Sequence, residues 1–189
     1  MDNKERILEA TIKVFNRKGL KFTMDDIASE LSMSKKTIYT VFKDKDTMLL
    51  QMVDYCFDRI KESELAIIHN NSLSTIEKIR QILGVLPEGY AEIDFRQLYI
   101  LKDKYPKIYQ KMEQRLETGW EGTIQLIKKG IEEEVVRPFN VIIFKTMLEA
   151  TLEQFFQRDI LISNKISYKD ALDECVSILV DGIKVNEKK

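Results

Sequence analysis

The sequence predicts an all-α protein in which an N-terminal three-helix head is followed by a larger helical bundle. Gly and Pro account for only 7 and 3 of the 189 residues, and a chain poor in both and rich in Leu, Ile, Lys and Glu favours helices. Apolar residues recur three or four positions apart, which is the spacing of one helix face. Capping residues divide this pattern into about nine helices, with a head over 1–45 and a bundle over 46–189.

The head begins with a helix predicted from Asn3 to Lys18, which ends at Gly19 because glycine readily adopts the backbone of a helix C-cap. The next stretch, from Thr23 to Lys45, reads TMDDIASELSMSKKTIYTVFKDK. It predicts two short helices joined by a tight turn, which is a helix-turn-helix.

Local signals mark where both short helices begin. Thr23 can form a capping box with Asp26, and Ser34 stands at the N-cap of the second helix. Phe22 and Ile27 fit a hydrophobic staple around the first cap. Because so few residues separate the two helices, we expect their crossing angle to have little freedom.

The second short helix exposes lysines, hydroxyls and an aromatic ring on the face opposite its apolar stripe. Ile38 and Phe42, four residues apart, form that stripe. A face of this kind suits insertion into the major groove of DNA. The alternative is the solvated surface of an ordinary helical hairpin. The exposed residues are Lys35, Lys36, Thr37, Tyr39, Thr40 and Val41.

The segment from Arg6 to Leu50 resembles the N-terminal domain of tetracycline-repressor-type (TetR-like) bacterial regulators. The matching elements are ILEATIKVFNRKG, T-x-x-D-I-A, S-K-x-T-x-Y-x-x-F-x-x-K and the Leu-rich start of a fourth helix. The sequence departs from the family at Ser32 and Lys36, where the family often has glycine. A non-glycine residue at positive φ costs on the order of 1 kcal/mol, so Ser32 is tolerable in the turn. Lys36 adds positive charge at the groove-facing helix.

The resemblance implies a DNA-contact role for each matching residue. Backbone N–H groups at the helix starts would help to hold phosphates. Base preference does not carry over from the family. The residues implied to hold phosphates are Thr23, Ser34, Lys35, Tyr39 and Lys45. The residues implied to lie nearest the base edges are Lys36, Thr37, Thr40 and Val41.

The bundle is predicted to begin with a long fourth helix, capped by Asp44 and reaching Ile68. A capping box at Ser74 and Glu77 starts the next helix. One long helix should contain both Gly119 and Gly122, and we expect it to bend there or to approach another backbone closely. The remaining predicted helices span 94–104, 106–134, 140–158 and 167–185.

The last two predicted helices carry more apolar surface than one core can bury. The helix over 140–158 is apolar nearly all round, and the helix over 167–185 has two apolar stripes. This surplus predicts a four-helix interface with a twofold-related copy, which is also what the resembled family forms. The alternative is that both faces belong to the core. A dimer would set two recognition helices about 34–36 Å apart on a palindromic operator.

In the resembled family, the middle helices enclose a cavity whose small-molecule ligand changes the spacing of the two heads. Aromatic and polar residues of this chain could line such a cavity, although aromatic residues at helical spacing are also typical of a core. Nothing in the sequence selects a ligand class. The residues proposed for this cavity are Tyr90, Phe95, Arg96, Tyr99, Trp120 and Phe144.

Composition argues against several other classes of protein. The sequence has one His, no metal-ligand spacing, no Gly-rich phosphate loop and no nucleophile elbow, so we predict no enzyme, metal or cofactor. We interpret Cys56 and Cys175 as reduced, buried thiols, with a redox sensor as the alternative, and His69 as a surface residue. No apolar run reaches 18 residues and the N-terminus is not a signal peptide, so we expect a cytoplasmic protein.

Charge is distributed in the sense expected for a DNA-binding head. Residues 1–48 hold 10 Lys and Arg against 8 Asp and Glu, and the remaining residues hold 20 against 23. The sequence therefore predicts a DNA-binding transcriptional regulator, most simply a repressor released by a ligand. The alternative is a helical module that binds a protein partner through the same motif, without DNA.

Overall fold

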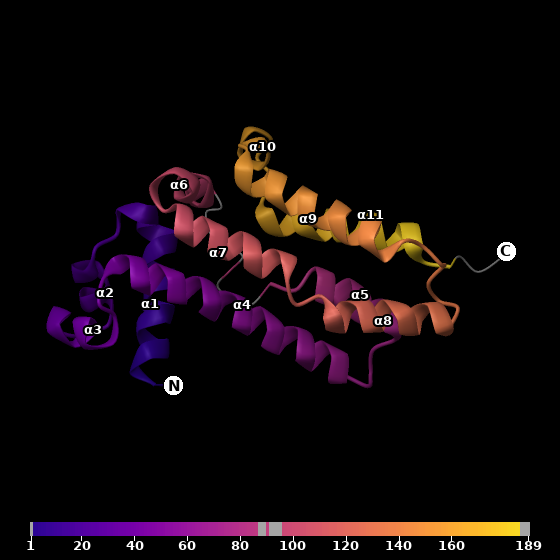
Figure 1. Ribbon diagram of the computed structural model, residues 1–189, viewed down its shortest axis with the longest axis horizontal. Helices are drawn as coiled ribbons and strands as arrows, with labels where there is room; N and C mark the ends of the chain where they lie inside the picture. Colours follow the sequence, from indigo (N-terminus) through magenta and orange to yellow (C-terminus); the bar gives the residue numbers. More distant parts are fainter. Residues whose placement is uncertain (1, 87–89, 91–95, 186–189) are drawn as a thin grey trace. The chain divides into compact units, whose positions relative to one another are not determined.

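The computed structural model describes residues 2–86, 90 and 96–185. These residues form eleven α-helices and one 3-10 turn, and the only β-type pairing among them is an isolated bridge between Val136 and Lys184. The predicted all-α class is confirmed (Figure 1). The chain divides into a first unit within 1–58 and 88–115 and a second unit within 59–87 and 116–189.

The first unit contains the three helices of the head and the start of the fourth. Their bounds agree with the predicted helices, and Gly19 ends the first helix at φ 56°. The 3-10 turn η1 (Gly19–Lys21) leads from α1 into α2. The elements are α1 (Asn3–Lys18), α2 (Met24–Glu30), α3 (Lys35–Val41), the first part of α4 (Lys45–His69), α6 (Arg96–Lys104) and most of α7 (Pro106–Glu117).

Large apolar side chains from all four N-terminal helices meet in the core of the head. Phe22 is 1% exposed and Ile27 is fully buried, which agrees with the predicted staple around Thr23. Burying a side chain of this size stabilises a fold by about 1.5–3 kcal/mol, so the head gains most of its stability from this cluster. Its most deeply buried members also include Ile7, Val14, Phe15, Ile38, Phe42, Met48 and Leu49.

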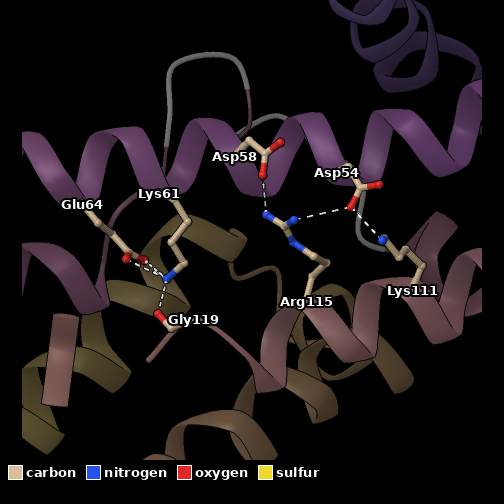
Figure 2. Close-up of polar contacts among 7 residues, drawn as sticks. All are labelled: Asp54, Asp58, Lys61, Glu64, Lys111, Arg115 and Gly119. Carbon is tan, nitrogen blue, oxygen red and sulfur yellow. Dashed lines mark hydrogen bonds and ion pairs between the residues drawn. The ribbon is translucent and has the colours of Figure 1, made fainter. Parts of the chain in front are cut away.

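In the first unit, α7 is held against α4 by ion pairs. Asp54 on α4 accepts from Lys111 Nζ at 3.0 Å, and Asp58 accepts from Arg115 at 2.6 Å (Figure 2). Arg115 also reaches Asp54 at 3.5 Å. One guanidinium therefore bridges two carboxylates one turn apart on α4.

The second unit is a packed helical bundle. Helix α5 packs against α8 and α11, and α11 packs along α9. Its core is apolar, with Ile79, Ile127 and Val180 fully buried. The elements are the rest of α4, α5 (Thr75–Leu83), α8 (Glu121–Glu132), α9 (Val141–Gln157), α10 (Ile160–Ser163) and α11 (Tyr168–Ile183).

One predicted helix was wrong: the segment 106–134 forms two helices, α7 and α8. The chain breaks at Gly119, which adopts φ 81° and whose carbonyl accepts from Lys61 Nζ at 2.7 Å (Figure 2). A Cβ at Gly119 would lie 2.7 Å from Lys61 Cε. The glycine therefore ends α7 and lets a lysine side chain approach the backbone. The short helix α10 was not predicted, and the predicted start of α6 at Asp94 lies outside the described residues.

None of the helices in the described part of the chain is both long enough and apolar enough to cross a membrane.

The turn between α2 and α3 holds Ser32 at φ 52°, which agrees with the positive φ expected at a position where the resembled family often has glycine. The next amide, Met33 N–H, donates to the Ala28 carbonyl at 2.9 Å and closes the end of α2.

We expect Ser32→Gly to raise the free energy of unfolding by about 1 kcal/mol, because glycine removes the Cβ strain of this backbone. The thermal midpoint should rise by roughly 2–4 °C. Ser29→Gly within α2 is the matched control, and it should lower stability by about 0.5 kcal/mol. A lower midpoint for Ser32→Gly would contradict the assignment of strain.

Candidate nucleic-acid interface

The caps of α2 and α3 fix where the two helices of the motif begin. Thr23 Oγ1 accepts from the Asp26 amide at 3.3 Å, and the Asp26 carboxylate accepts from the Thr23 amide at 2.8 Å. Ser34 Oγ accepts from the Thr37 amide at 3.1 Å. The capping box predicted at Thr23 and the cap predicted at Ser34 are both present.

Helix α3 separates its residues into a buried stripe and an exposed face. Ile38 is fully buried, and so is Phe42, which ends the helix. On the other side Tyr39 is 46% exposed. The exposed residues of this side also include Lys35, Lys36 and Thr40, while Thr37 and Val41 are half-buried. The face predicted from the sequence is therefore presented to solvent.

Hydroxyl groups on α3 already take part in hydrogen bonds within the motif. Thr40 Oγ1 donates to the Thr37 carbonyl at 2.6 Å. Ser34 Oγ and Thr37 Oγ1 lie 2.8 Å apart and share a hydrogen bond. With its proton committed to the helix, the hydroxyl of the exposed Thr40 can act towards a ligand only as an acceptor. It is therefore arranged to accept from a donor.

Lys35 forms an ion pair with Asp25 across the motif, with Nζ 2.8 Å from the carboxylate. The hydrogen bond to Asp25 raises the pKa of Lys35 above its ordinary value. Both side chains are largely solvent-exposed, at 46% and 67%. Because exposed pairs of this kind are weak, a stronger anion can replace Asp25 at the ammonium. Asp25 was not predicted as the partner of Lys35.

Asp26 is the acidic centre of this region. The hydrogen bond from Lys18 Nζ, at 2.7 Å, and that from the Thr23 amide lower the pKa of Asp26 to about 2. The carboxylate therefore stays ionised at every physiological pH and holds the start of α2.

The Lys45 ammonium contacts the connection between α1 and α2. Its Nζ donates to the carbonyls of Leu20 and Phe22, both at 2.6 Å. The same ammonium lies 4.0 Å from the centroid of the Phe22 ring. The structure therefore places this residue, which the resemblance assigns to phosphate, against the backbone of the α1–α2 connection.

Residues proposed for a ligand cavity fall in both units. In the second unit, Trp120 is half-buried and Phe144 is buried. Tyr90 is buried in the first unit. Phe95 lies outside the described residues, and for Arg96 and Tyr99 only the backbone of α6 is described.

A polar pair that was not predicted from the sequence lies beside Trp120. Lys145 Nζ is 5.8 Å from the centroid of the Trp120 ring and 3.4 Å from the carboxylate of Glu149. Burial raises the pKa of Glu149. The four-residue spacing of Lys145 and Glu149 was the available signal, but the same spacing is common on exposed helix faces.

Helices α9 and α11 carry exposed apolar side chains. Ile142, Ile143 and Met147 on α9 are 73%, 57% and 53% exposed, and Ile178 on α11 is 65% exposed. A Cβ at Gly182, one turn after Ile178, would meet no atom within 4 Å. We call these five residues the α9–α11 face.

Both cysteines are free thiols. The sequence predicted them to be buried, and the structure shows both to be half-buried. Burial raises the pKa of Cys56 to about 12 and also raises that of Cys175. A thiol with a raised pKa forms little reactive thiolate. His69 is exposed, as predicted.

Comparison with known proteins places the motif in one family. Residues 7–52 match the family model described as "Bacterial regulatory proteins, tetR family". HTH-type transcriptional regulator YvaF of Bacillus subtilis is 26% identical over 97% of both chains. IcaR of Staphylococcus aureus, an HTH-type negative transcriptional regulator of the biofilm operon icaADBC, is 23% identical over 80% of this chain and 75% of its own.

Solved structures share the fold. A transcriptional regulator of Saccharomonospora viridis in complex with choline superposes with a TM-score of 0.73 over 97% of this chain and 98% of its own, at 19% identity.

We expect Asp26→Asn to destabilise the protein above about pH 4 and to have progressively less effect as the pH falls towards 2. The folded-state pKa of about 2 lies below the ordinary value of 3.8. The stabilisation is therefore present above the ordinary value and is lost as pH falls through the folded-state value.

The measurement is the difference in thermal midpoint between wild type and variant from about pH 6 down to about pH 2. Ser34→Ala is the control, because the Ser34 hydroxyl caps α3 through the Thr37 amide, and its loss should cost about 1 kcal/mol at every pH. A difference for Asp26→Asn that does not change with pH would refute the linkage.

Proposed function

This chain is a TetR-like helix-turn-helix transcriptional regulator, and on that premise we propose that it is a cytoplasmic homodimeric repressor that a small molecule releases from a palindromic operator. The observation that carries the DNA-binding part is the exposed face of α3 opposite the buried Ile38 and Phe42. IcaR, a negative regulator, supports repression as the outcome. No catalysis is part of this proposal.

In the proposed complex, α3 enters the major groove with its N-terminus towards the backbone. The unpaired amides and the positive end of the helix attract phosphate there. Phosphates would be held by Thr23, Ser34, Lys35, Tyr39 and Lys45, and base edges would be read by Lys36, Thr37, Thr40 and Val41.

On binding DNA, Lys35 would exchange its partner Asp25 for a phosphate. In the free protein its ammonium pairs with Asp25, and both groups are exposed. A phosphate can take the ammonium while Asp25 returns to water, so the exchange involves little desolvation. Asp25 would then repel misplaced phosphates on its side of the motif.

Dimerisation is proposed through the α9–α11 face. Soluble monomers rarely leave large apolar patches uncovered. Helices α9 and α11 pack together within one chain, so a twofold-related copy would complete a four-helix bundle. Two copies of α3 could then read successive major grooves, and one short helix would not have to supply all the affinity.

The effector site is proposed in the body of the chain, 46–189, with the head over 1–45 reserved for DNA. Trp120 and Phe144, beside Lys145 and Glu149, offer aromatic and charged groups within one unit. The regulator of Saccharomonospora viridis that is bound to choline has the same fold. An effector would have to favour the state that cannot bind DNA, and a coupling of about 1–3 kcal/mol changes affinity roughly 5- to 150-fold. The sequence-based prediction of Tyr90, Phe95, Arg96 and Tyr99 as ligand-binding residues is separate from this site.

We expect a duplex selected from a random library to be palindromic and to bind less tightly as salt rises. Because Lys36 is proposed to read a base edge, Lys36→Ala should relax base preference and leave the slope of log affinity against log salt unchanged. A slope reduced by about 0.9 for each neutralised phosphate would instead assign Lys36 to the DNA backbone. The measurement is a gel shift at several salt concentrations, with exposed Lys13→Ala on α1 as control. If no duplex is enriched, the alternative of a protein-binding module is favoured.

We expect Ile178→Lys to convert the dimer to a monomer, because two lysines would be brought together in an apolar interface. The side chain is 65% exposed in one chain, so the fold of the monomer should persist. The measurement is mass in solution by light scattering, together with operator affinity. Leu65→Lys, at 54% exposure on α4, is the control and should stay dimeric. A dimeric Ile178→Lys protein would place the interface elsewhere.

A further inference from the structure

We infer that Lys61 is a positioning residue, and that by tying α4 to the junction between α7 and α8 it restricts the half-site spacing that the proposed dimer accepts. The inference rests on the proposed DNA binding by a dimer and adds to it a residue that lies outside the proposed DNA contacts. Its basis is the way in which two lysines hold the end of α7.

Side chains from two other helices donate to backbone carbonyls at the end of α7. Lys61 Nζ on α4 donates to the Gly119 carbonyl at 2.7 Å, and Lys145 Nζ on α9 donates to the Glu117 carbonyl at 2.9 Å. The last carbonyls of a helix have no partner within it, and the negative end of the helix dipole attracts ammonium groups. All four residues belong to the second unit. The α7–α8 junction is therefore a point at which α4 and α9 are both held.

The Lys61 ammonium is surrounded by as many acceptor atoms as it has N–H groups. Besides the Gly119 carbonyl, it donates to the two carboxylate oxygens of Glu64 at 2.9 and 2.7 Å (Figure 2). The Glu64 side chain is only 15% exposed, so solvent ions screen this pair less than they screen a pair at the surface. The carboxylate therefore neutralises the ammonium and holds it in place for the Gly119 carbonyl.

Gly119 has the backbone and the space that this contact requires. Its φ of 81° lies in the left-handed region that favours glycine. A Cβ at this position would lie 2.7 Å from Lys61 Cε and 3.1 Å from Lys61 Nζ. Any other residue at this position would therefore displace the lysine as well as strain the backbone.

The contact can control the course of α4 because α4 is one uninterrupted helix. It runs from Lys45, in the first unit, to His69 and contains neither Pro nor Gly, which are common causes of a sharp bend. Lys61 holds this helix to the same junction that Lys145 joins to α9, and α9 belongs to the proposed dimer interface. Without the Lys61 contact, α4 would vary in direction relative to α9. The two heads of a dimer would then sample more spacings.

The test compares Lys61→Met with Arg59→Met on duplexes that differ in half-site spacing. Methionine keeps an apolar stem and removes the N–H donors. Arg59 is the matched control, because it also lies on α4 and pairs at 3.0 Å with Glu62, a residue of the same helix. The duplexes are the library-selected palindrome, the same palindrome with one base pair added or removed at its centre, and a single half-site. The measurement is affinity by gel shift at one salt concentration.

Wild type and Arg59→Met should bind the altered spacings about tenfold more weakly than the selected palindrome, since one base pair rotates a half-site by about a tenth of a helical turn. Lys61→Met should bind the selected palindrome about tenfold more weakly than wild type does, which is the scale of one charge-assisted hydrogen bond. It should also lose most of the discrimination between spacings. Its affinity for the single half-site should equal that of wild type, because the head itself is unchanged.

Two results overturn the positioning role while DNA binding stands. One is wild-type discrimination between spacings in folded Lys61→Met, and the other is an equal loss of affinity for the palindrome and the half-site. If Lys61→Met does not fold, Gly119→Ala disrupts the contact from the other side. This variant should show the same loss of discrimination, and wild-type discrimination in it would overturn the inference.

Reductive methylation of the wild type tests the contact without DNA and without a variant. Lys61 should react more slowly than Lys128, which is exposed on α8, and equal rates overturn the inference. This measurement decides if neither variant folds. If the wild type is a monomer or binds no duplex, the proposed function fails, and the methylation rates still test whether the Gly119 carbonyl holds Lys61.

Discussion

The recognition helix depends on the burial of two side chains. Helix α3 spans only Lys35–Val41, and isolated helices shorter than about 12–15 residues are marginal in water. Its helical form must therefore come from packing, and fully buried Ile38 and Phe42 provide it. The same packing leaves the opposite side of α3 exposed, so the stability of the helix and the presentation of its proposed DNA-contact side have one cause.

Polar groups in the head refine an arrangement that apolar packing establishes. Caps at Thr23 and Ser34 fix the first residues of α2 and α3. Lys45 then joins the start of α4 to the α1–α2 connection through two carbonyls. Farther along α4, Asp54 and Asp58 hold α7 through Lys111 and Arg115. Helix α4 is thus held at its start by the head and later by α7, within the first unit.

The proposed dimer gives a role to apolar surface that one chain leaves uncovered. The α9–α11 face would bury isoleucine and methionine side chains that are more than half exposed in the monomer, and each Å² of apolar surface removed from water contributes about 25 cal/mol before association costs. Because affinity for an operator would then depend on two heads, a small change in their spacing could control it. That dependence would be the physical basis of the proposed regulation by an effector.

The sequence by itself determined the features that depend on neighbouring residues: the caps, the buried stripe of α3, the positive φ of Ser32 and most helix bounds. These are set by interactions within a few residues, which a sequence displays directly. Only the tertiary structure decided that Gly119 breaks a helix by accepting from Lys61, that Lys45 turns towards Leu20 and Phe22, and which side of apolar α9 faces inward. Each of these features depends on a residue that is distant in the sequence and that only tertiary packing brings near. The local sequence therefore does not indicate it.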